Sequence, residues 1–193
     1  MTARRHRYAI AMLLLAPFAG RAAEVTYKID PAHTYPSFEA DHMGISVWRG
    51  KMDHTSGTIV YDKAAGAGTI DVDVDLASIS FGMPKLDEWA RGTDFFNVAK
   101  YPTAHYHGRF SGAKQGQPAT AEGTMTLHGV SQPMALQIHR IKCIPHPLYK
   151  RELCGADALA HFQRDAFGLD AGKSYGFDMT VTLRIQVEAL AAP

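Results

Sequence analysis

The stretch Ile70-Asp71-Val72-Asp73-Val74-Asp75-Leu76 alternates strictly between an aliphatic residue and an aspartate. Successive side chains of a β-strand point to opposite faces of a sheet, so this stretch predicts a strand with one apolar face and one fully charged face. One face then lies in a core and the other in water, which is typical of antiparallel sheets.

The same period of two recurs along most of the chain. A long run at residues 179–187 has an aliphatic side chain or methionine at every second position. Shorter runs lie at residues 25–29, 37–41, 46–52, 57–61, 104–110, 120–127, 134–141 and 157–164. Turn-forming residues gather between them at 63–68, 111–118 and 129–133. The pattern predicts an all-β meander of hairpins closed into an antiparallel barrel, since closure removes exposed strand edges.

One segment interrupts the strand pattern. Pro84 stands where a first helical residue is expected and Gly92 where a helix ends, so a short helix is predicted between them. Its apolar residues Leu86, Trp89 and Ala90 share one face, which we expect to lie against the barrel. This is the single helical insertion in the predicted fold.

Composition restricts the class of protein. Of 193 residues, 46% are hydrophobic and 20% are charged, which excludes a disordered chain and a polytopic membrane protein. The formal charge is +1, and the sequence contains no block of like charge that could bind a phosphate backbone. Nucleic acid is therefore not an expected partner.

The N-terminus has the pattern of an export signal. Arginines precede an apolar run at residues 8–19, which is too short to cross a bilayer as a helix, and small residues follow it. Cleavage is expected between Ala22 and Ala23, by Sec-type export. Residues 1–22 are therefore predicted to be a signal peptide, and 23–193 a mature periplasmic domain without a stable membrane span.

The only two cysteines of the chain are Cys143 and Cys154. In an oxidising compartment such a pair is most simply a disulfide, here enclosing a turn-rich excursion between two strands. A redox-active pair is the alternative, but catalytic cysteines are usually separated by two residues rather than ten.

Signatures of common enzymes are missing: the sequence has no Gly-x-Ser-x-Gly, His-Glu-x-x-His or phosphate-binding glycine loop. His105 and His107 lie two apart on a predicted strand and so face the same way, as two metal ligands would, but no third ligand is identifiable. His33 and His42 fall at strand ends, where an imidazole orients a turn or caps a polar head group. Arg164-Asp165 is either a strand-end ion pair or a contact for an anionic head group.

Aromatic and methionine side chains have two interpretations. They either fill a barrel core or line a cavity for an apolar ligand, and periodicity does not choose between these. The set comprises Phe38, Trp48, Phe81, Trp89, Phe95, Phe96, Phe110, Phe162 and Phe167, with Met83, Met125 and Met134.

Five segments in order resemble the YceI-like family of exported, lipocalin-like β-barrels. They are Tyr27-Lys28-Ile29-Asp30-Pro31-Ala32-His33-Thr34, Phe38-Glu39-Ala40-Asp41-His42-Met43-Gly44-Ile45-Ser46, Asp94-Phe95-Phe96-Asn97-Val98-Ala99-Lys100-Tyr101-Pro102, Gly123-Thr124-Met125-Thr126-Leu127-His128-Gly129-Val130-Ser131-Gln132-Pro133 and Arg164-Asp165-Ala166-Phe167-Gly168. The resemblance implies an extended lipocalin-like barrel that binds a polyisoprenoid or comparable long-chain amphiphile, such as a quinone or prenyl phosphate. It implies no catalytic activity, and no cofactor beyond a bound isoprenoid lipid. The stretch 86–92 departs from the family pattern, so head-group contacts do not carry over there.

The insertion before Phe95-Phe96 carries the apolar residues Phe81, Met83, Leu86 and Trp89, so it is expected to cover the barrel mouth. The hydrophobic cavity residues are then expected to be Phe38, Phe81, Leu86, Trp89, Phe95, Phe96, Phe110, Met125 and Leu127. The polar head of the lipid is expected near His42 or Arg91.

Two other function classes stay open. One is a metal- or histidine-dependent small-molecule enzyme or redox accessory protein, and the other is a packed barrel that acts through a protein partner. The oligomeric state is also open, with a homodimer among the options.

Overall fold

The computed structural model describes residues 24–113 and 117–193. The expected signal peptide, residues 1–22, lies outside this part of the chain. The strands are β1 (Val25–Ile29), β2 (Tyr35–His42), β3 (Ser46–Met52), β4 (Thr55–Asp62), β5 (Ala67–Asp75), β6 (Ile79–Ser80), β7 (Thr103–Ser111), β8 (Thr120–Leu127), β9 (Val130–Pro145), β10 (Glu152–Gln163) and β11 (Thr180–Ala191). The helices are α1 (Pro84–Arg91) and three short 3-10 helices, η1 (Leu76–Ser78), η2 (Arg164–Phe167) and η3 (Lys173–Tyr175).

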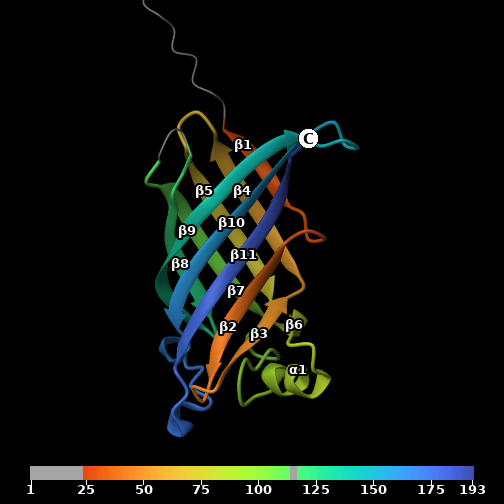
Figure 1. The fold of residues 1–193 in the computed structure, drawn as a ribbon. Coiled ribbons are helices and arrows are strands. Elements are labelled where there is room, and N and C mark those ends of the chain that lie inside the picture. The colour runs from red at the N-terminus through yellow and green to blue at the C-terminus, as the bar shows by residue number, and fades with distance from the viewer. Residues whose placement is uncertain (1–23, 114–116) are drawn as a thin grey trace, which may run out of the picture.

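Eight antiparallel strands close into a barrel, as the sequence predicts. Their order around the barrel is β1-β4-β5-β7-β8-β9-β10-β11, and β11 pairs back to β1. The strands run steeply and are long, so the barrel is tall (Figure 1).

The last strand of the barrel has two partners on the same side. Residues Ala189–Ala191 of β11 pair with β1, whereas Val181–Gln186 pair with β2. β3 and the short β6 then extend the sheet beyond β2. These strands therefore lengthen the barrel wall at the end where α1 also lies. We call this end, drawn at the bottom of Figure 1, the lower end, and the opposite one the upper end.

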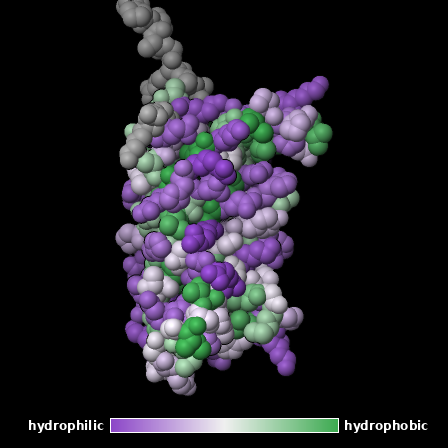
Figure 2. All heavy atoms as spheres, in the orientation of Figure 1, coloured by the Kyte–Doolittle hydropathy of each residue, from purple (hydrophilic) through white to green (hydrophobic). Residues whose placement is uncertain are grey.

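The aspartate-rich stretch behaves as its alternation predicts. In β5, Asp71, Asp73 and Asp75 are exposed, Ile70 is buried, and Val72 and Val74 are partly buried. The outer wall seen in Figure 2 is mostly hydrophilic for the same reason. The residues facing inward form three packed groups along the barrel.

The three groups are stacked from one end to the other. The upper one contains Tyr27, Ile29, Tyr61, Ala189 and Ala191. The middle one contains Ile70, Tyr106, Ala121, Met134, Leu136 and Ala160. The lower one contains Met52, Leu76, Ile79, Ala90, Phe96, Ala104, Leu127, Phe167 and Leu169.

One predicted turn is shorter than expected. Residues 129–133 were expected to form a loop, but β9 already begins at Val130, and His128-Gly129 alone connect it to β8. Both have positive φ, 52° and 77°, which is the backbone of the tight two-residue hairpin turn that matches strand twist. Pro133 is accommodated inside the strand opposite Thr124.

The predicted helix is present, but it ends differently. α1 begins at Pro84, as expected from the fixed φ of proline, and stops at Arg91. Gly92 has an extended backbone, φ −68° and ψ 175°, rather than the left-handed conformation of a glycine cap. Among the described residues, no helix combines the length and apolarity that crossing a bilayer requires.

Candidate binding cavity

A cavity occupies the lower part of the barrel. The volume open to the centre of a water molecule is about 180 Å³, against roughly 10–15 Å³ for a single water site. Its lining is Pro36, Phe38, Ala40, Asp41, Trp48, Met52, Val74, Leu76, Ile79, Phe81, Trp89, Phe95, Phe96, Ala104, Met125, Leu127, Phe162, Arg164, Leu169, Ala171, Phe177, Val181 and Leu183. Only Asp41 and Arg164 carry charge in this wall, so the space suits an apolar chain.

The wall is assembled from segments distant in sequence. β2 and β3 supply the aromatic residues Phe38 and Trp48, and β5, β7 and β8 supply Val74, Ala104, Met125 and Leu127. Inward positions repeat every second residue along β2, at Pro36, Phe38 and Ala40, as the pleat requires. The period of two thus determines which side chains reach the cavity.

Seven of the nine expected cavity residues line this space. They are Phe38, Phe81, Trp89, Phe95, Phe96, Met125 and Leu127. The other two, Leu86 and Phe110, lie elsewhere. Leu86 is partly buried on α1, while Phe110 lines a smaller hollow of about 40 Å³ with Tyr27 and Tyr61. Phe110, expected to line the ligand cavity, therefore lies next to the upper group of core residues instead.

Trp89 connects the cavity with the outside. Its side chain lines the cavity although the residue is 41% exposed, and it stacks on Phe95 with ring centroids 5.1 Å apart. Phe95 in turn meets Phe96 edge-on at 4.7 Å. α1 and the segment after it thus border the cavity. Figure 1 shows α1 at the lower end of the barrel.

Exposed hydrophobic residues gather at the same end. Met43, Ile45 and Val47, at the tip of the β2–β3 hairpin, are 51%, 78% and 49% exposed. Met83 and Tyr175 are also exposed, before α1 and in η3. Figure 2 shows hydrophobic surface over the hairpin tip.

The two residues expected to hold a polar head lie outside the lining. His42 stacks on Trp48 at 4.1 Å and meets Phe177 edge-on at 5.1 Å, so it stands behind two aromatic residues of the wall. Arg91 belongs to the last turn of α1. The neighbouring Asp41 does line the cavity, and its carboxylate accepts backbone N–H groups of Gly44 and Asp178.

The cationic group in the wall is Arg164, at the start of η2. It is buried, with Nη1 donating to Leu169 O and Nη2 to Ala171 O, each at 2.6 Å. Burial lowers the pKa of its guanidinium, and the charges of Asp165 and Asp170 act in the opposite direction. Asp165 pairs with Lys173 at 2.7 Å instead of forming the strand-end pair with Arg164 that was one of the two interpretations.

Four residues of the wall are missing from the expected cavity list. Met52 and Phe177 were not considered, whereas Trp48 was among the aromatic residues with two interpretations and Arg164 was one possible contact for an anionic head group. Trp48 and Met52 lie four residues apart on β3 and therefore on the same face of the strand. Strand periodicity could have placed both of them in the wall. Phe177 lies in an irregular segment between η3 and β11, where no periodicity applies. Arg164 adjoins the cavity only because the chain turns into η2 immediately after β10.

The histidines considered as metal ligands lie on the outer wall. His105 Nδ1 is 2.8 Å from an Asp73 oxygen and His107 Nδ1 is 3.0 Å from an Asp71 oxygen, as cross-strand pairs of β5 and β7. In the described part of the chain, neither shares a cluster of three ligand-type side chains suited to a metal. The arrangement is that of cross-strand His–Asp contacts on a solvated strand face.

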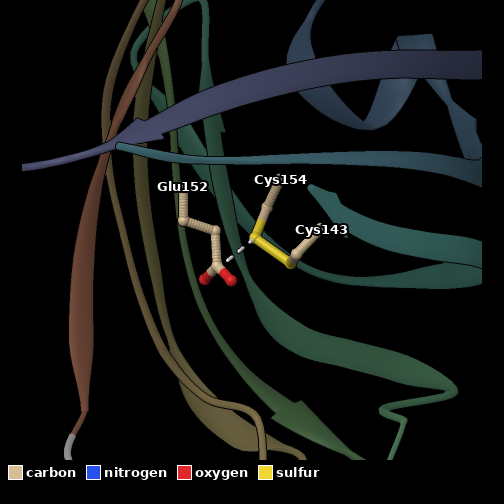
Figure 3. A group of neighbouring side chains, drawn as sticks. All are labelled: Cys143, Glu152 and Cys154. Atoms are coloured by element: carbon tan, nitrogen blue, oxygen red, sulfur yellow. Dashed lines mark hydrogen bonds between the residues drawn. A yellow bond between two sulfur atoms is a disulfide. The ribbon is translucent and has the colours of Figure 1, made fainter. Parts of the chain in front are cut away.

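The two cysteines form the expected disulfide at the upper end. They face each other directly across β9 and β10, with Cα atoms 4.0 Å apart. Figure 3 shows Glu152 beside them, with one carboxylate oxygen 3.9 Å from Cys154 Sγ. Because disulfide sulfurs carry neither a proton nor a thiolate charge, this is a contact and the trio offers no thiolate to a metal.

Comparison with known proteins agrees with this architecture. The profile of the YceI-like domain matches residues 27–189. A UPF0312 protein of Shewanella putrefaciens is 32% identical over 133 residues, covering 68% of this chain and 70% of the relative. A UPF0312 protein of Shewanella baltica is 30% identical over the same length and shares of the two chains.

Solved structures share the fold at low sequence identity. BcnA of Burkholderia cenocepacia superposes with a TM-score of 0.65 at 18% identity, covering 83% of this chain and 99% of BcnA. A polyisoprenoid binding domain from Saccharophagus degradans, implicated in plant cell wall breakdown, gives 0.65 at 18% identity over 87% and 99%. The YCEI protein of Campylobacter jejuni gives 0.64 at 22% identity over 79% and 90%.

Proposed function

The chain belongs to the YceI-like family, and on that premise we propose that it binds a polyisoprenoid or similar long-chain amphiphile in the lower cavity of its barrel. The observation that carries the proposal is the cavity itself, which is walled almost entirely by aliphatic and aromatic side chains. Each buried CH₂ of a ligand contributes about 0.8 kcal/mol, so several isoprene units are enough for tight binding. The polyisoprenoid binding domain from Saccharophagus degradans has the same fold.

The protein acts as a carrier or scavenger in the periplasm under this proposal. The disulfide between Cys143 and Cys154 supports an oxidising compartment, where such bonds persist. The pattern of residues 1–22 supports export by the Sec route. A binding role is supported by the family, by the polyisoprenoid binding domain of the same fold, and by a wall that offers contacts to an apolar chain.

Two observations bear on the alternative functions. A metal- or histidine-dependent activity has less support, because His105 and His107 lie on the outer wall away from the cavity and no third ligand-type side chain joins them among the described residues. A packed barrel working only through a protein partner requires a filled interior, whereas the lower end holds a cavity of about 180 Å³.

The test is direct binding of farnesol to the purified mature protein, with native mass spectrometry of freshly purified material for a co-purifying lipid. Both tryptophans of the chain, Trp48 and Trp89, line the cavity, so intrinsic fluorescence reports its occupation. A matched pair of variants gives the location. Ala40→Trp fills the cavity and should abolish binding, whereas Ala135→Trp, on the exposed face of β9, should not. If the wild-type protein neither carries a co-purifying lipid nor binds added farnesol, the proposal is refuted.

A further inference from the structure

We propose that the cavity selects amphiphiles with an anionic head group, a carboxylate or a phosphate, and that Arg164 is the residue that binds the anion. This rests on the function proposed above and specifies its ligand class. The inference starts from a buried cation in an otherwise apolar wall: Arg164 is 7% exposed and lines the cavity. An ionised side chain in such surroundings is costly unless opposite charge or hydrogen bonds compensate it.

The protein contacts this charge directly only through dipoles, while the carboxylates of Asp165 and Asp170 act on it from a distance. The hydrogen bonds of the guanidinium go to two backbone carbonyls, Leu169 O and Ala171 O. No ion pair to Arg164 within 4.0 Å occurs among residues 24–113 and 117–193, and arginine remains protonated even when its pKa falls. The positive charge therefore lacks a directly paired anion.

The carboxylates nearest in sequence or in the wall have other partners. Asp165 is bound by Lys173 at 2.7 Å. Asp41 accepts N–H bonds from the backbone of Gly44 and Asp178, which ties the β2–β3 hairpin to the segment before β11. Both bonding patterns hold these carboxylates in place, and Asp170, whose charge also acts on Arg164, forms no ion pair with it within 4.0 Å. An incoming anion is therefore the available direct partner for Arg164.

The guanidinium also has donors to spare. It carries five N–H groups in a planar fork that matches a carboxylate or a phosphate, and the two carbonyls use one on each terminal nitrogen. Its Cζ atom lies 5.8 Å from the centre of the Phe95 ring, which also lines the cavity. An acyl or prenyl chain packed on Phe95 thus has its charged end within reach of the fork.

A neutral head group would use the same fork less well. An alcohol or quinone oxygen accepts a hydrogen bond, but it leaves the buried charge uncompensated. Charge-assisted hydrogen bonds are roughly twice as strong as neutral ones, and the pairing is stronger where water is excluded. The structure therefore favours farnesyl phosphate or dodecanoate over the uncharged alcohols of the same chains.

The experiment compares matched ligands on the wild-type protein by tryptophan fluorescence titration, each kept below its critical micelle concentration. Farnesyl phosphate should bind about 10-fold to 100-fold more tightly than farnesol, and dodecanoate more tightly than dodecanol, as expected for one charge-assisted contact. The preference should persist in 0.5 M NaCl, because a buried pair is screened far less than a surface one. Preference for phosphate alone would identify the anion as phosphate.

Variants then locate the contact. Arg164→Gln should bring the affinity for farnesyl phosphate down to that for farnesol while farnesol binding changes little. Arg91→Gln, which removes a cation on α1 outside the wall, should keep the full preference. If Arg164→Gln fails to fold, the wild-type comparison and Arg91→Gln still decide.

Three outcomes would overturn the inference. Equal affinity for charged and uncharged partners refutes it while leaving lipid binding intact. Retention of the preference in Arg164→Gln, or its loss in Arg91→Gln, moves the anion site away from Arg164. Failure of all four ligands to bind contradicts the proposed function instead, so the two failures are distinguishable.

Discussion

The ring of Tyr106 lies so close to the backbone of Gly123, on the neighbouring strand, that a Cβ atom on Gly123 would stand 2.8 Å from Tyr106 Cζ. Gly108 is paired with Gly123 across β7 and β8, and a Cβ there would also meet the tyrosine ring. The ring of Tyr106 thus packs directly on the backbone of the two glycines. Because neither glycine has a side chain, the barrel can hold this large residue at its middle.

Gly123→Ala should therefore destabilise the protein by about 1–3 kcal/mol, the usual cost of overpacking. The added methyl would also lie 2.3 Å from His107 O, so the backbone must move. Gly155→Ala on β10 is the control, since its nearest neighbour would be 3.6 Å away. Urea unfolding of both variants checks this, and equal free energies of unfolding would contradict it.

Alkaline pH should weaken the fold through buried tyrosines. Burial raises the pKa of Tyr106 to about 12, and its hydroxyl donates to Ala121 O and Met134 O at 3.0 and 3.2 Å. In the unfolded chain a tyrosine ionises near pH 10. The unfolded state thus loses the proton first, so the contribution of Tyr106 is complete below pH 10 and is lost as the pH rises to about 12.

Tyr106→Phe removes that ionisation, so its free energy of unfolding should fall less steeply between pH 10 and 12 than that of the wild type. Tyr27 and Tyr61, whose pKa values burial also raises, keep part of the slope. Urea unfolding at several pH values, with tyrosinate absorbance as a second signal, measures the difference. Identical slopes would show that Tyr106 does not titrate in this way.

Removing the disulfide should affect stability but not ligand binding. Closing a loop of this length contributes roughly 2–3 kcal/mol in the chain-entropy model, so the double variant Cys143→Ser, Cys154→Ser should lose about that much. The bond lies at the upper end, away from the cavity, and lipid affinity should stay unchanged. Thiol titration of the unfolded wild type should give no reaction before reduction and two thiols after it; free thiols beforehand would contradict the bond.

Strand positions were predictable because alternation is a local property. The aspartates of β5 point outward as their period requires, and β1, β3 and β8 have the expected bounds. The ends of β9 and β10 were harder to predict. Pairing between the two strands extends both of them past the disulfide, into residues that show no alternation in the sequence.

The cavity was only partly predictable. Aromatic content indicated an apolar interior, yet whether Phe110 faces the cavity or the upper core depends on its height along the barrel, which follows from strand register. Arg164 is a similar case. Its sequence neighbour Asp165 suggested an ion pair, but η2 directs Asp165 to Lys173 and leaves the arginine in the wall.

Trp89 offers a test of the mouth of the cavity, which we expect α1 to cover. Trp89 lines the cavity and is 41% exposed. Removing its ring should therefore remove contacts with a ligand while disturbing little of the packed core. Trp89→Ala should weaken farnesol binding by about 1–3 kcal/mol, the usual range for burying a large apolar side chain. The remaining Trp48 fluorescence reports binding in this variant.

Phe110→Ala is the matched control, because Phe110 packs against Tyr61 at 5.4 Å in the hollow at the other end of the barrel. Truncating it should cost about 3–5 kcal/mol of stability, as for other core phenylalanines, and leave farnesol affinity unchanged. Trp89→Ala should show the reverse, with lower affinity and a smaller loss of stability. If the affinity of Trp89→Ala equals that of the wild type, α1 does not cover the ligand, whereas a loss of affinity in Phe110→Ala would mean that the chain extends upward through the middle group of core residues.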